Sequence, residues 1–231
     1  MSGERLRIVA IDGVLGSGKT TVARQVALAL GIDYLDTGAM YRSVAWAALR
    51  NGLSLEPIDE RGVTTLAQGL MIEIDAAHVQ VNGIDVADAI RAGEVARAAS
   101  VVATLAGVRR AMVDQQRDWA RRRGAGVLEG RDIATVVFPD AAVKVFLTAE
   151  LRERSRRRHA EMPEQTLEQI EADLRWRDHN DSTRAVDPLQ VAAGATVIDT
   201  TGMSVVDVVD RIVALVPWNR SAPNDAEGQR T

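Results

Sequence analysis

Gly13-Val14-Leu15-Gly16-Ser17-Gly18-Lys19-Thr20 is the stretch that decides the fold. It fits the phosphate-loop pattern, which is a glycine, four residues and then Gly-Lys-Ser/Thr. The apolar run that precedes it, Arg7 to Ile11, predicts a buried parallel strand. Apolar residues then recur at helical spacing up to Gly31, which predicts a helix over about 21–30 that ends at this glycine. The sequence therefore predicts a strand, a glycine-rich turn and a helix in direct succession.

This order of elements is suited to binding phosphate. Glycines let consecutive backbone N–H groups face one anion, and the start of the helix adds the positive end of its dipole. In this pattern Lys19 reaches the β- and γ-phosphates of a nucleotide, and the hydroxyl of Thr20 is the expected ligand of Mg²⁺. A tight turn with a capping threonine is the alternative, but the strand and the helix on either side favour the phosphate loop.

The composition excludes several other kinds of site. The chain has 231 residues, 46% of them apolar, which suits one large domain or one domain with an insertion. There is no cysteine, so disulfides, thiolate catalysis and cysteine–metal sites are excluded, and the three histidines are too scattered for a metal cluster. A net charge of −4 argues against binding nucleic acid. No apolar run is long enough to span a membrane and the N-terminus has no signal-peptide core, so we expect a cytoplasmic protein, which we take to be a monomer.

A change of hydrophobic period marks an insertion. Strands and helices alternate along most of the chain, which predicts an open, mostly parallel five-stranded sheet with helices on both faces. Between residues 71 and 86 the pattern alternates every second residue, and Asn82-Gly83 is a strong signal for a tight antiparallel hairpin. A hairpin does not belong in a parallel series. We therefore divide the chain into a core over 1–62 and 101–217 with a helical lid over about 150–180, an inserted subdomain over 63–100, and a disordered polar tail over 218–231.

Polar residues follow the predicted strands at one edge of the sheet. Asp36-Thr37 comes after a short strand, Glu129 to Asp132 come after Gly126-Val127-Leu128, and Thr200 follows the last strand. Ligands of such folds bind beyond the carboxyl ends of the strands. We therefore expect these residues to meet the phosphate loop in one site. Two helices, over 87–100 and 103–123, and a second lid helix over 166–179 are expected around it.

The motifs and charged residues elsewhere in the sequence indicate which class of reaction the phosphate loop serves. The chain has no Asn-Lys-x-Asp motif, which disfavours a GTPase, and no second strand ending in Asp-Glu, which disfavours a motor or helicase. Arginines surround the predicted site instead. Guanidinium forks suit phosphate oxygens, and phosphoryl transfer depends on positioning and on neutralising charge. The pattern favours an enzyme joining two phosphorylated substrates over a nucleotide-dependent switch or binding protein.

Several segments resemble the bacterial cytidylate (CMP) kinases, within the nucleoside monophosphate kinases. They are Ile11-Asp12-Gly13 with the phosphate loop, Leu35 to Arg42, Gly130 to Pro139, and Arg177-Asp178 with Arg184-Ala185-Val186. The resemblance covers about residues 6–215, and Gly130-Arg131-Asp132 is its most specific part. It implies an α/β P-loop kinase fold and transfer of the γ-phosphoryl group of ATP to CMP, and also to dCMP, with Mg²⁺ as cofactor.

The same resemblance implies roles for individual residues. Contacts to ATP are expected from Gly13, Val14, Leu15, Gly16, Ser17, Gly18, Lys19, Thr20, Thr21, Arg154, Arg157 and Arg158. Contacts to CMP are expected from Tyr41 and Ser100, from Arg42 and Arg131 at the phosphate, from Arg177 and Asp181 at the ribose, and from Thr37, Arg109 and Asp132 at the base. The expected catalytic residues are Lys19, Arg131, Arg157 and Arg184.

The residues by themselves leave several assignments open. The lid arginines could form only a solvated helix face, and Arg131 with Asp132 could be a local surface ion pair. Arg109 and Arg110 point in different directions on a helix, so only one of them can face the site. Glu129 could hold the water shell of Mg²⁺ or cap a turn. The nearest rival functions transfer the same group to UMP, AMP or shikimate.

Overall fold

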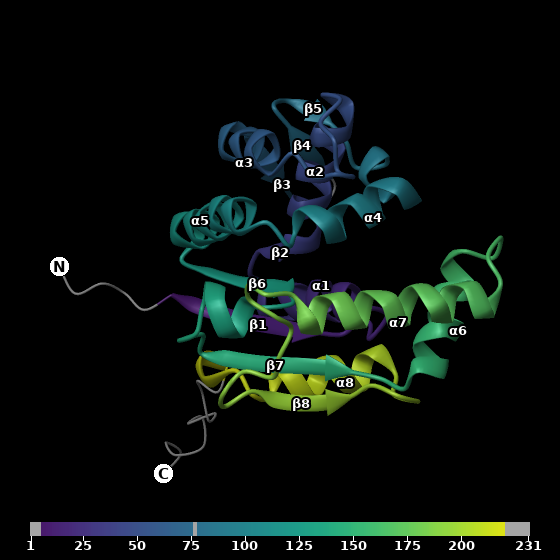
Figure 1. Ribbon diagram of the computed structural model, residues 1–231. Helices are drawn as coiled ribbons and strands as arrows, with labels where there is room; N and C mark the ends of the chain where they lie inside the picture. The colour runs from purple at the N-terminus through teal and green to yellow at the C-terminus, as the bar shows by residue number, and fades with distance from the viewer. Residues whose placement is uncertain (1–5, 76–77, 220–231) are drawn as a thin grey trace, which may run out of the picture.

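The fold is built on a parallel five-stranded sheet, seen edge-on near the centre of the computed structural model in Figure 1. The structure describes residues 6–75 and 78–219. Every pairing within this sheet is parallel, so the carboxyl ends of its strands meet at one edge, as predicted. In spatial order the strands are β2 (Tyr34–Asp36), β6 (Ala125–Gly130), β1 (Arg7–Gly13), β7 (Val143–Thr148) and β8 (Thr196–Asp199).

Helices cover both faces of this sheet because the central strand is apolar on both sides. Val9 and Ile11 of β1 belong to one core, which α1 and α8 complete. Ile8 and Ala10, which point the other way, belong to a second core shared with α2 and α5. The four covering helices are α1 (Lys19–Leu30), α2 (Thr37–Arg50), α5 (Ala106–Arg123) and α8 (Val205–Val213).

The predicted insertion forms a separate antiparallel sheet. Asn82 and Gly83 both have positive φ, 50° and 77°, as the predicted hairpin turn requires. Figure 1 shows this sheet with α2, α3 and α4 above the five-stranded sheet. One helix predicted over 87–100 is instead a 3-10 turn and an α-helix, because Ala92 between them is extended. The elements are α3 (Glu60–Gly69), β3 (Ile72–Ile74), β4 (Val79–Val81), β5 (Ile84–Asp85), η1 (Ala89–Arg91) and α4 (Gly93–Val102).

The predicted lid is a pair of packed helices, α6 (Leu151–Glu161) and α7 (Leu167–Thr183). In Figure 1 they project from the sheet at the right, where β7 ends. A capping box between Thr166 and Gln169 begins α7, which then runs four residues beyond the predicted end at His179. This extra turn keeps Asp181 on the helix.

The last described residues differ from the prediction. Trp218 and Asn219, expected to begin the polar tail, belong to a short 3-10 turn, η3 (Pro217–Asn219). The remainder of that tail, residues 220–231, lies outside the described residues. Over residues 6–75 and 78–219, no helix combines the length and the hydropathy needed to cross a membrane.

Candidate active site

The phosphate loop connects β1 to α1 in a tightly constrained turn. Gly13 has φ of 151°, and a Cβ there would lie 2.0 Å from the carbonyl oxygen of Leu147, so only glycine lets the loop leave β1 beside β7. Gly18, at φ 88°, is the N-cap of α1 and makes no side-chain cap, which leaves the first amides of the helix facing the loop. The Ser17 hydroxyl donates to the Val14 carbonyl at 2.9 Å and braces the turn.

Lys19 lies folded inside this loop. Its side chain is buried, and Nζ donates to the Val14 carbonyl oxygen at 2.7 Å. Burial, followed by the nearby Arg131 guanidinium, lowers the pKa of Lys19 to about 7. An incoming polyphosphate would reverse that effect by supplying the missing negative charge. The loop therefore presents a desolvated cation ready to pair with phosphate.

Oxygen donors suited to Mg²⁺ lie at the start of α1. The Thr20 hydroxyl donates to Glu129 Oε1 at 2.5 Å, and the Tyr34 hydroxyl donates to the same oxygen at 2.8 Å. Glu129 is buried, and burial raises the pKa of its carboxyl. Mg²⁺ prefers a few protein oxygens together with water and substrate phosphates. The described residues contain no group of three or more acidic, histidine or cysteine side chains placed for a metal ion.

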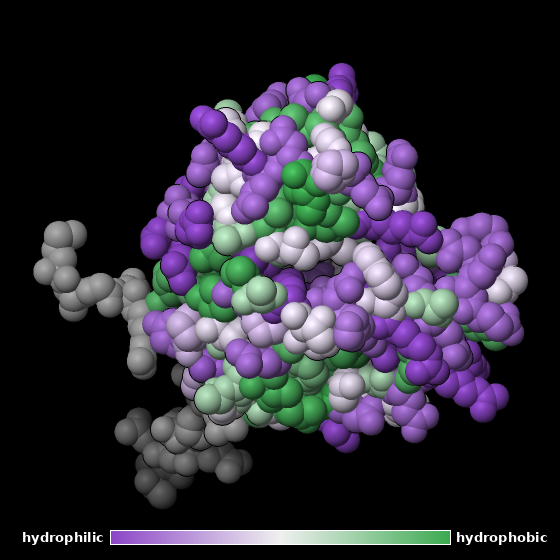
Figure 2. Space-filling view, viewed as in Figure 1, coloured by the Kyte–Doolittle hydropathy of each residue, from purple (hydrophilic) through white to green (hydrophobic). Residues whose placement is uncertain are grey.

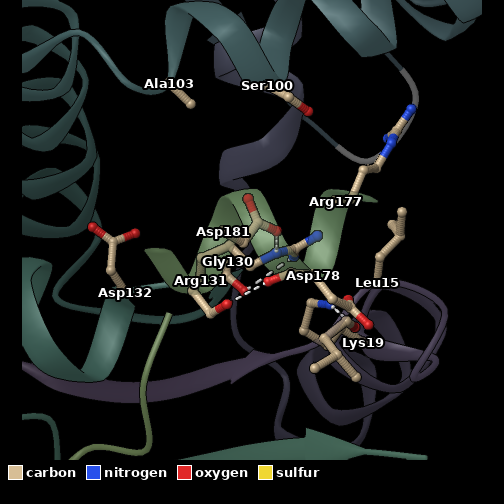
Figure 3. Close-up of polar contacts among 12 residues, drawn as sticks. Leu15, Lys19, Ser100, Ala103, Gly130, Arg131, Asp132, Arg177, Asp178 and Asp181 are labelled. Atoms are coloured by element: carbon tan, nitrogen blue, oxygen red, sulfur yellow. Dashed lines mark hydrogen bonds and ion pairs between the residues drawn. The ribbon is translucent and has the colours of Figure 1, made fainter. Parts of the chain in front are cut away.

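Arg131 lies at the centre of the site (Figure 3). It follows β6, and its Nε donates to Asp181 Oδ2 of α7 at 2.6 Å. Figure 3 shows Lys19 on one side of Arg131 and Asp132 on the other. Arg131 and Asp132 are therefore not the local ion pair that the sequence left open. Asp181 spans the gap from the lid helix to the end of β6.

Arg42 and Arg177, which are predicted to contact the CMP phosphate and ribose, each form an ion pair with an aspartate. Arg42 Nη2 lies 2.8 Å from Asp36 Oδ2, the same carboxylate that caps α2. Arg177 Nε lies 3.1 Å from Asp173 Oδ2, one turn earlier on α7. Figure 3 shows the Arg177 side chain extending away from Arg131.

A buried ion cluster forms the other end of the site. Arg109 of α5 has an exposed fraction of 1%, whereas Arg110 is exposed, so Arg109 is the one that faces inward, as the resemblance implied. Its Nη2 donates to Asp132 Oδ2, and its guanidinium carbon lies 5.6 Å from the centre of the Tyr41 ring. Burial raises the pKa of Asp132, while Arg109 lowers it. The second cation of the cluster, Arg184, places Nη2 3.9 Å from Asp132 Oδ1.

The lid arginines differ from one another. Arg154 is buried and donates to the Leu15 carbonyl of the phosphate loop at 3.1 Å and to Asp178 of α7 at 2.7 Å. Arg157 donates to the carbonyl of Thr200 at 2.7 Å, and the Thr200 hydroxyl donates to the Ser17 carbonyl. These two are therefore not a solvated face.

Other predicted residues are placed less directly. Arg158 pairs with Glu161 on its own helix at 2.9 Å. The Thr37 hydroxyl is buried and donates to the Glu129 carbonyl at 2.6 Å, so it fixes the end of β6. Ser100 donates weakly within α4, at 3.5 Å from the Ala96 carbonyl. Thr21 is exposed on the first turn of α1.

Sequence reasoning did not assign a role to Asp12. This carboxylate is buried inside β1 and accepts the backbone N–H groups of Ile133 at 2.9 Å and Ala134 at 2.8 Å. It thereby fixes the short π-helical turn, residues 133–137, that follows Asp132. Burial raises its pKa to about 6, against the lowering effect of the two amides. The sequence signal that could have identified Asp12 is an acidic residue directly after the apolar run Ile8 to Ile11.

One face of the molecule carries a depression. Figure 2 shows the face hollowed between the part that carries the three-stranded sheet and the part that carries the five-stranded sheet. Hydrophilic residues gather at the right of the hollow, over α6 and α7. A separate cavity of about 710 Å³ lies between the β3–β4 hairpin and α5, and none of the predicted site residues lines it.

Comparisons with known proteins place this chain in a family. A family model described as cytidylate kinase matches residues 9–217. The chain is 44% identical to a cytidylate kinase of Desulfitobacterium hafniense, covering 90% of this chain and 91% of that one. It is 48% identical to a bifunctional pantoate ligase/cytidylate kinase of Trichormus variabilis over 91% of this chain, but spans only 41% of that longer protein.

A solved structure supports the fold alone. TT1252 from Thermus thermophilus superposes with a TM-score of 0.52 at 18% identity, covering 94% of this chain and all of that one. The overall α/β arrangement is thus shared at low sequence identity.

Proposed function

The chain belongs to the cytidylate kinase family, and from that membership we propose that it transfers the γ-phosphoryl group of ATP to CMP, and also to dCMP. The products are ADP and the corresponding diphosphate. The observation that carries the proposal is the arrangement around Arg131. The phosphate loop with Lys19 lies on one side of it, and the buried Arg109–Asp132 pair lies on the other.

The buried pair supports a cytosine base in particular. Cytosine presents an N4 amino donor where uracil presents an O4 acceptor. An ionised Asp132 is an acceptor only, so it can take the cytosine amino proton but repels uracil O4. Burial raises the pKa of Asp132, and Arg109 opposes that effect by favouring the ionised carboxylate. Arg109 also offers further donors to the O2 and N3 edge. A buried site of this kind rejects the wrong base because its own groups would be left unpaired.

The transfer requires no covalent enzyme intermediate. An oxygen of the CMP phosphate attacks the γ-phosphorus in line, and the bond to the β–γ bridging oxygen breaks, so that ADP leaves with that oxygen. Lys19 and Arg131 neutralise charge on the transferring group, with Arg157 acting from the lid. Arg184 is proposed to be a further catalytic residue. Its guanidinium lies beside Asp132.

The remaining residues hold the two substrates. Arg42 and Arg131 bind the CMP phosphate, and Arg177 with Asp181 binds the ribose. Arg154 and Arg158 join Arg157 over the ATP phosphates, and closure of α6 and α7 excludes water that would otherwise hydrolyse ATP. Monomeric state and cytoplasmic location remain part of the proposal, as the sequence predicts.

Mg²⁺ is proposed as the cofactor that accompanies ATP. The Thr20 hydroxyl would ligate it, and the Glu129 carboxylate, which accepts a hydrogen bond from the Thr20 hydroxyl, would hold its water shell. When bound, the ion supplies Lewis-acid stabilisation of the β- and γ-phosphate oxygens.

A panel of acceptors tests the proposal. ADP release by the purified chain is measured with ATP and Mg²⁺, alone and with CMP, dCMP, UMP, AMP or shikimate. We expect strong stimulation by CMP and dCMP and weak stimulation by the others. Absence of stimulation by CMP would indicate a switch or binding protein, and equal rates with another acceptor would overturn the assignment of the substrate.

A further inference from the structure

Asp187, in the loop that follows α7, contacts both arginines of the buried cluster. Its Oδ2 accepts from Arg109 Nε at 2.7 Å, across 78 residues of sequence. Its backbone carbonyl accepts from Arg184 Nε at 2.7 Å. One residue thus fixes the inner N–H of two guanidinium groups, and neither contact belongs to the catalytic or binding roles assigned above.

The backbone at Asp187 is held in an unfavourable conformation. Its φ is +49°, in the left-handed region that residues other than glycine seldom occupy. Pro188 follows it, and a residue before proline favours extended backbone. Such conformations persist where the surrounding contacts require them, and they concentrate at functional sites. Here the contacts are those to Arg109 and Arg184.

The charges of the cluster balance only when Asp187 is counted. Arg109 and Arg184 supply two cations, and Asp132 and Asp187 supply two carboxylates. The Arg109 and Asp132 side chains are 2% and 6% exposed, so water compensates little of any imbalance. Without Asp187, both guanidinium groups would compete for Asp132.

That competition matters because one oxygen of Asp132 is still available. Asp132 Oδ2 accepts from Arg109, whereas Oδ1 lies 3.9 Å from Arg184 Nη2 and accepts no hydrogen bond from any residue within 6–75 or 78–219. Among the same residues, Arg184 Nη2 is buried without a hydrogen-bond partner. A slight shift of Arg184 would join these two atoms and close the acceptor.

We infer that Asp187 is a positioning residue for base specificity. By holding Arg109 and Arg184 through their Nε atoms, it leaves Asp132 Oδ1 open to the amino group of the acceptor base. The inference rests on the proposed cytidylate transfer and adds a residue that acts through Arg109 and Asp132 without touching the substrate.

Two variants test it with the backbone preserved. Asp187→Asn removes the charge, and Asn tolerates the left-handed conformation nearly as well as Asp. Asp187→Gly removes the side chain and adopts positive φ freely. For each variant, kcat/KM is measured with CMP and UMP, and KM is measured for ATP. We expect the CMP/UMP ratio to fall about tenfold, as for loss of one charge-assisted contact, with KM for ATP unchanged.

Two controls separate positioning from a merely structural role. Asp118→Asn removes an exposed Asp–Arg pair of the same type on α5 and should leave the ratio unchanged. In the Arg109→Ala background, Asp187→Asn should have no further effect on the ratio, because the Asp187 side chain holds only Arg109, whereas Arg184 is held by the backbone carbonyl, which the substitution leaves in place. Thermal unfolding of each variant identifies a folding defect.

The outcomes distinguish this inference from the proposed function. If the unaltered protein does not prefer CMP over UMP, the proposed function fails. If it does, but both Asp187 variants keep the ratio or lower both efficiencies equally, the positioning role is wrong. An equal effect of Asp187→Asn with and without Arg109 would also overturn it.

Discussion

Lys19 is the cation of the phosphate loop, and the proposed neutralisation of phosphate charge depends on it. It is buried, bonded to the Val14 carbonyl and lowered in pKa to about 7. We predict that Lys19→Ala lowers kcat by on the order of 10²–10³ or more, the usual size of such an electrostatic contribution, while the fold is retained. Lys144→Ala, at the only other lysine, is the matched control and should keep full activity. Near-normal turnover of Lys19→Ala would show that the phosphate loop is wrongly assigned.

The raised pKa of Asp12 predicts how the free energy of unfolding changes with pH. Its pKa is raised from 3.8 to about 6, chiefly by burial, so between these values the folded state keeps a proton that the unfolded state has released. The contribution of Asp12 to the free energy of unfolding therefore falls as pH rises from about 4 to about 6 and is constant above.

Asp12→Asn cannot titrate, which isolates this contribution. Relative to the variant, the unaltered protein should lose up to about 3 kcal/mol of unfolding free energy across that range, at about 1.4 kcal/mol per pKa unit. Denaturant unfolding of both proteins at pH 4, 5, 6 and 7 measures the difference. A difference that stays flat or grows with pH would contradict the raised pKa.

The elements themselves were largely predictable from local signals. The apolar run before Gly13, the helical spacing after it and the Asn82-Gly83 turn each specify a strand, a helix or a hairpin within a few residues. The break at Ala92 was missed because Ala87 to Ser100 contains no proline and continues a helical pattern. The extra turn of α7 was missed because Asn180 to Thr183 are poor helix formers, retained here by tertiary contacts such as Asp181 with Arg131.

The partners within the site were much less predictable. Arg109 meets Asp132 and Asp187, which lie 23 and 78 residues away. Neither spacing has a local signal, since these contacts depend on how α5, β6 and the loop after α7 pack together. The family resemblance implies base contacts for Arg109 and Asp132, which stay predictions, and it implies no role for Asp187.

Two arginines on different elements should affect the two substrates differently, Arg157 on α6 mainly ATP and Arg131 after β6 mainly CMP. Arg157 lies on the lid helix α6 and contacts Thr200 beside the phosphate loop, whereas Arg131 follows β6. We predict that Arg157→Ala raises KM for ATP and lowers kcat. Arg131→Ala should instead raise KM mainly for CMP, because a charge-assisted contact to its phosphate is lost. Steady-state kinetics with each substrate varied in turn separates the two; equal losses for both substrates in both variants would argue against this division.

At the scale of the whole molecule, the site spans parts that are distant in sequence. The phosphate loop, the end of β6 and α7 each contribute charged groups to it (Figure 3). A ligand that bridges them stabilises the folded state by mass action, by about 2.7 kcal/mol at a hundred times its Kd. We predict that CMP at such a concentration raises the Tm by about 5–10 °C, since 1 kcal/mol shifts a chain of this size by about 2–4 °C. UMP at the same concentration should raise it less, and equal shifts in a thermal melt would oppose the proposed base preference.

We propose that Asp132, buried against Arg109, selects cytosine. The most direct test is the ratio of kcat/KM for CMP to that for UMP, measured for the unaltered protein and for Asp132→Asn. The substitution keeps the shape of the side chain and adds an amide donor that can meet uracil O4. We predict that CMP efficiency falls and that the ratio narrows by at least about tenfold, the lower end of what one well-formed contact to a base is worth. A ratio that is the same in both proteins would contradict the claim and remove Asp132 from base recognition.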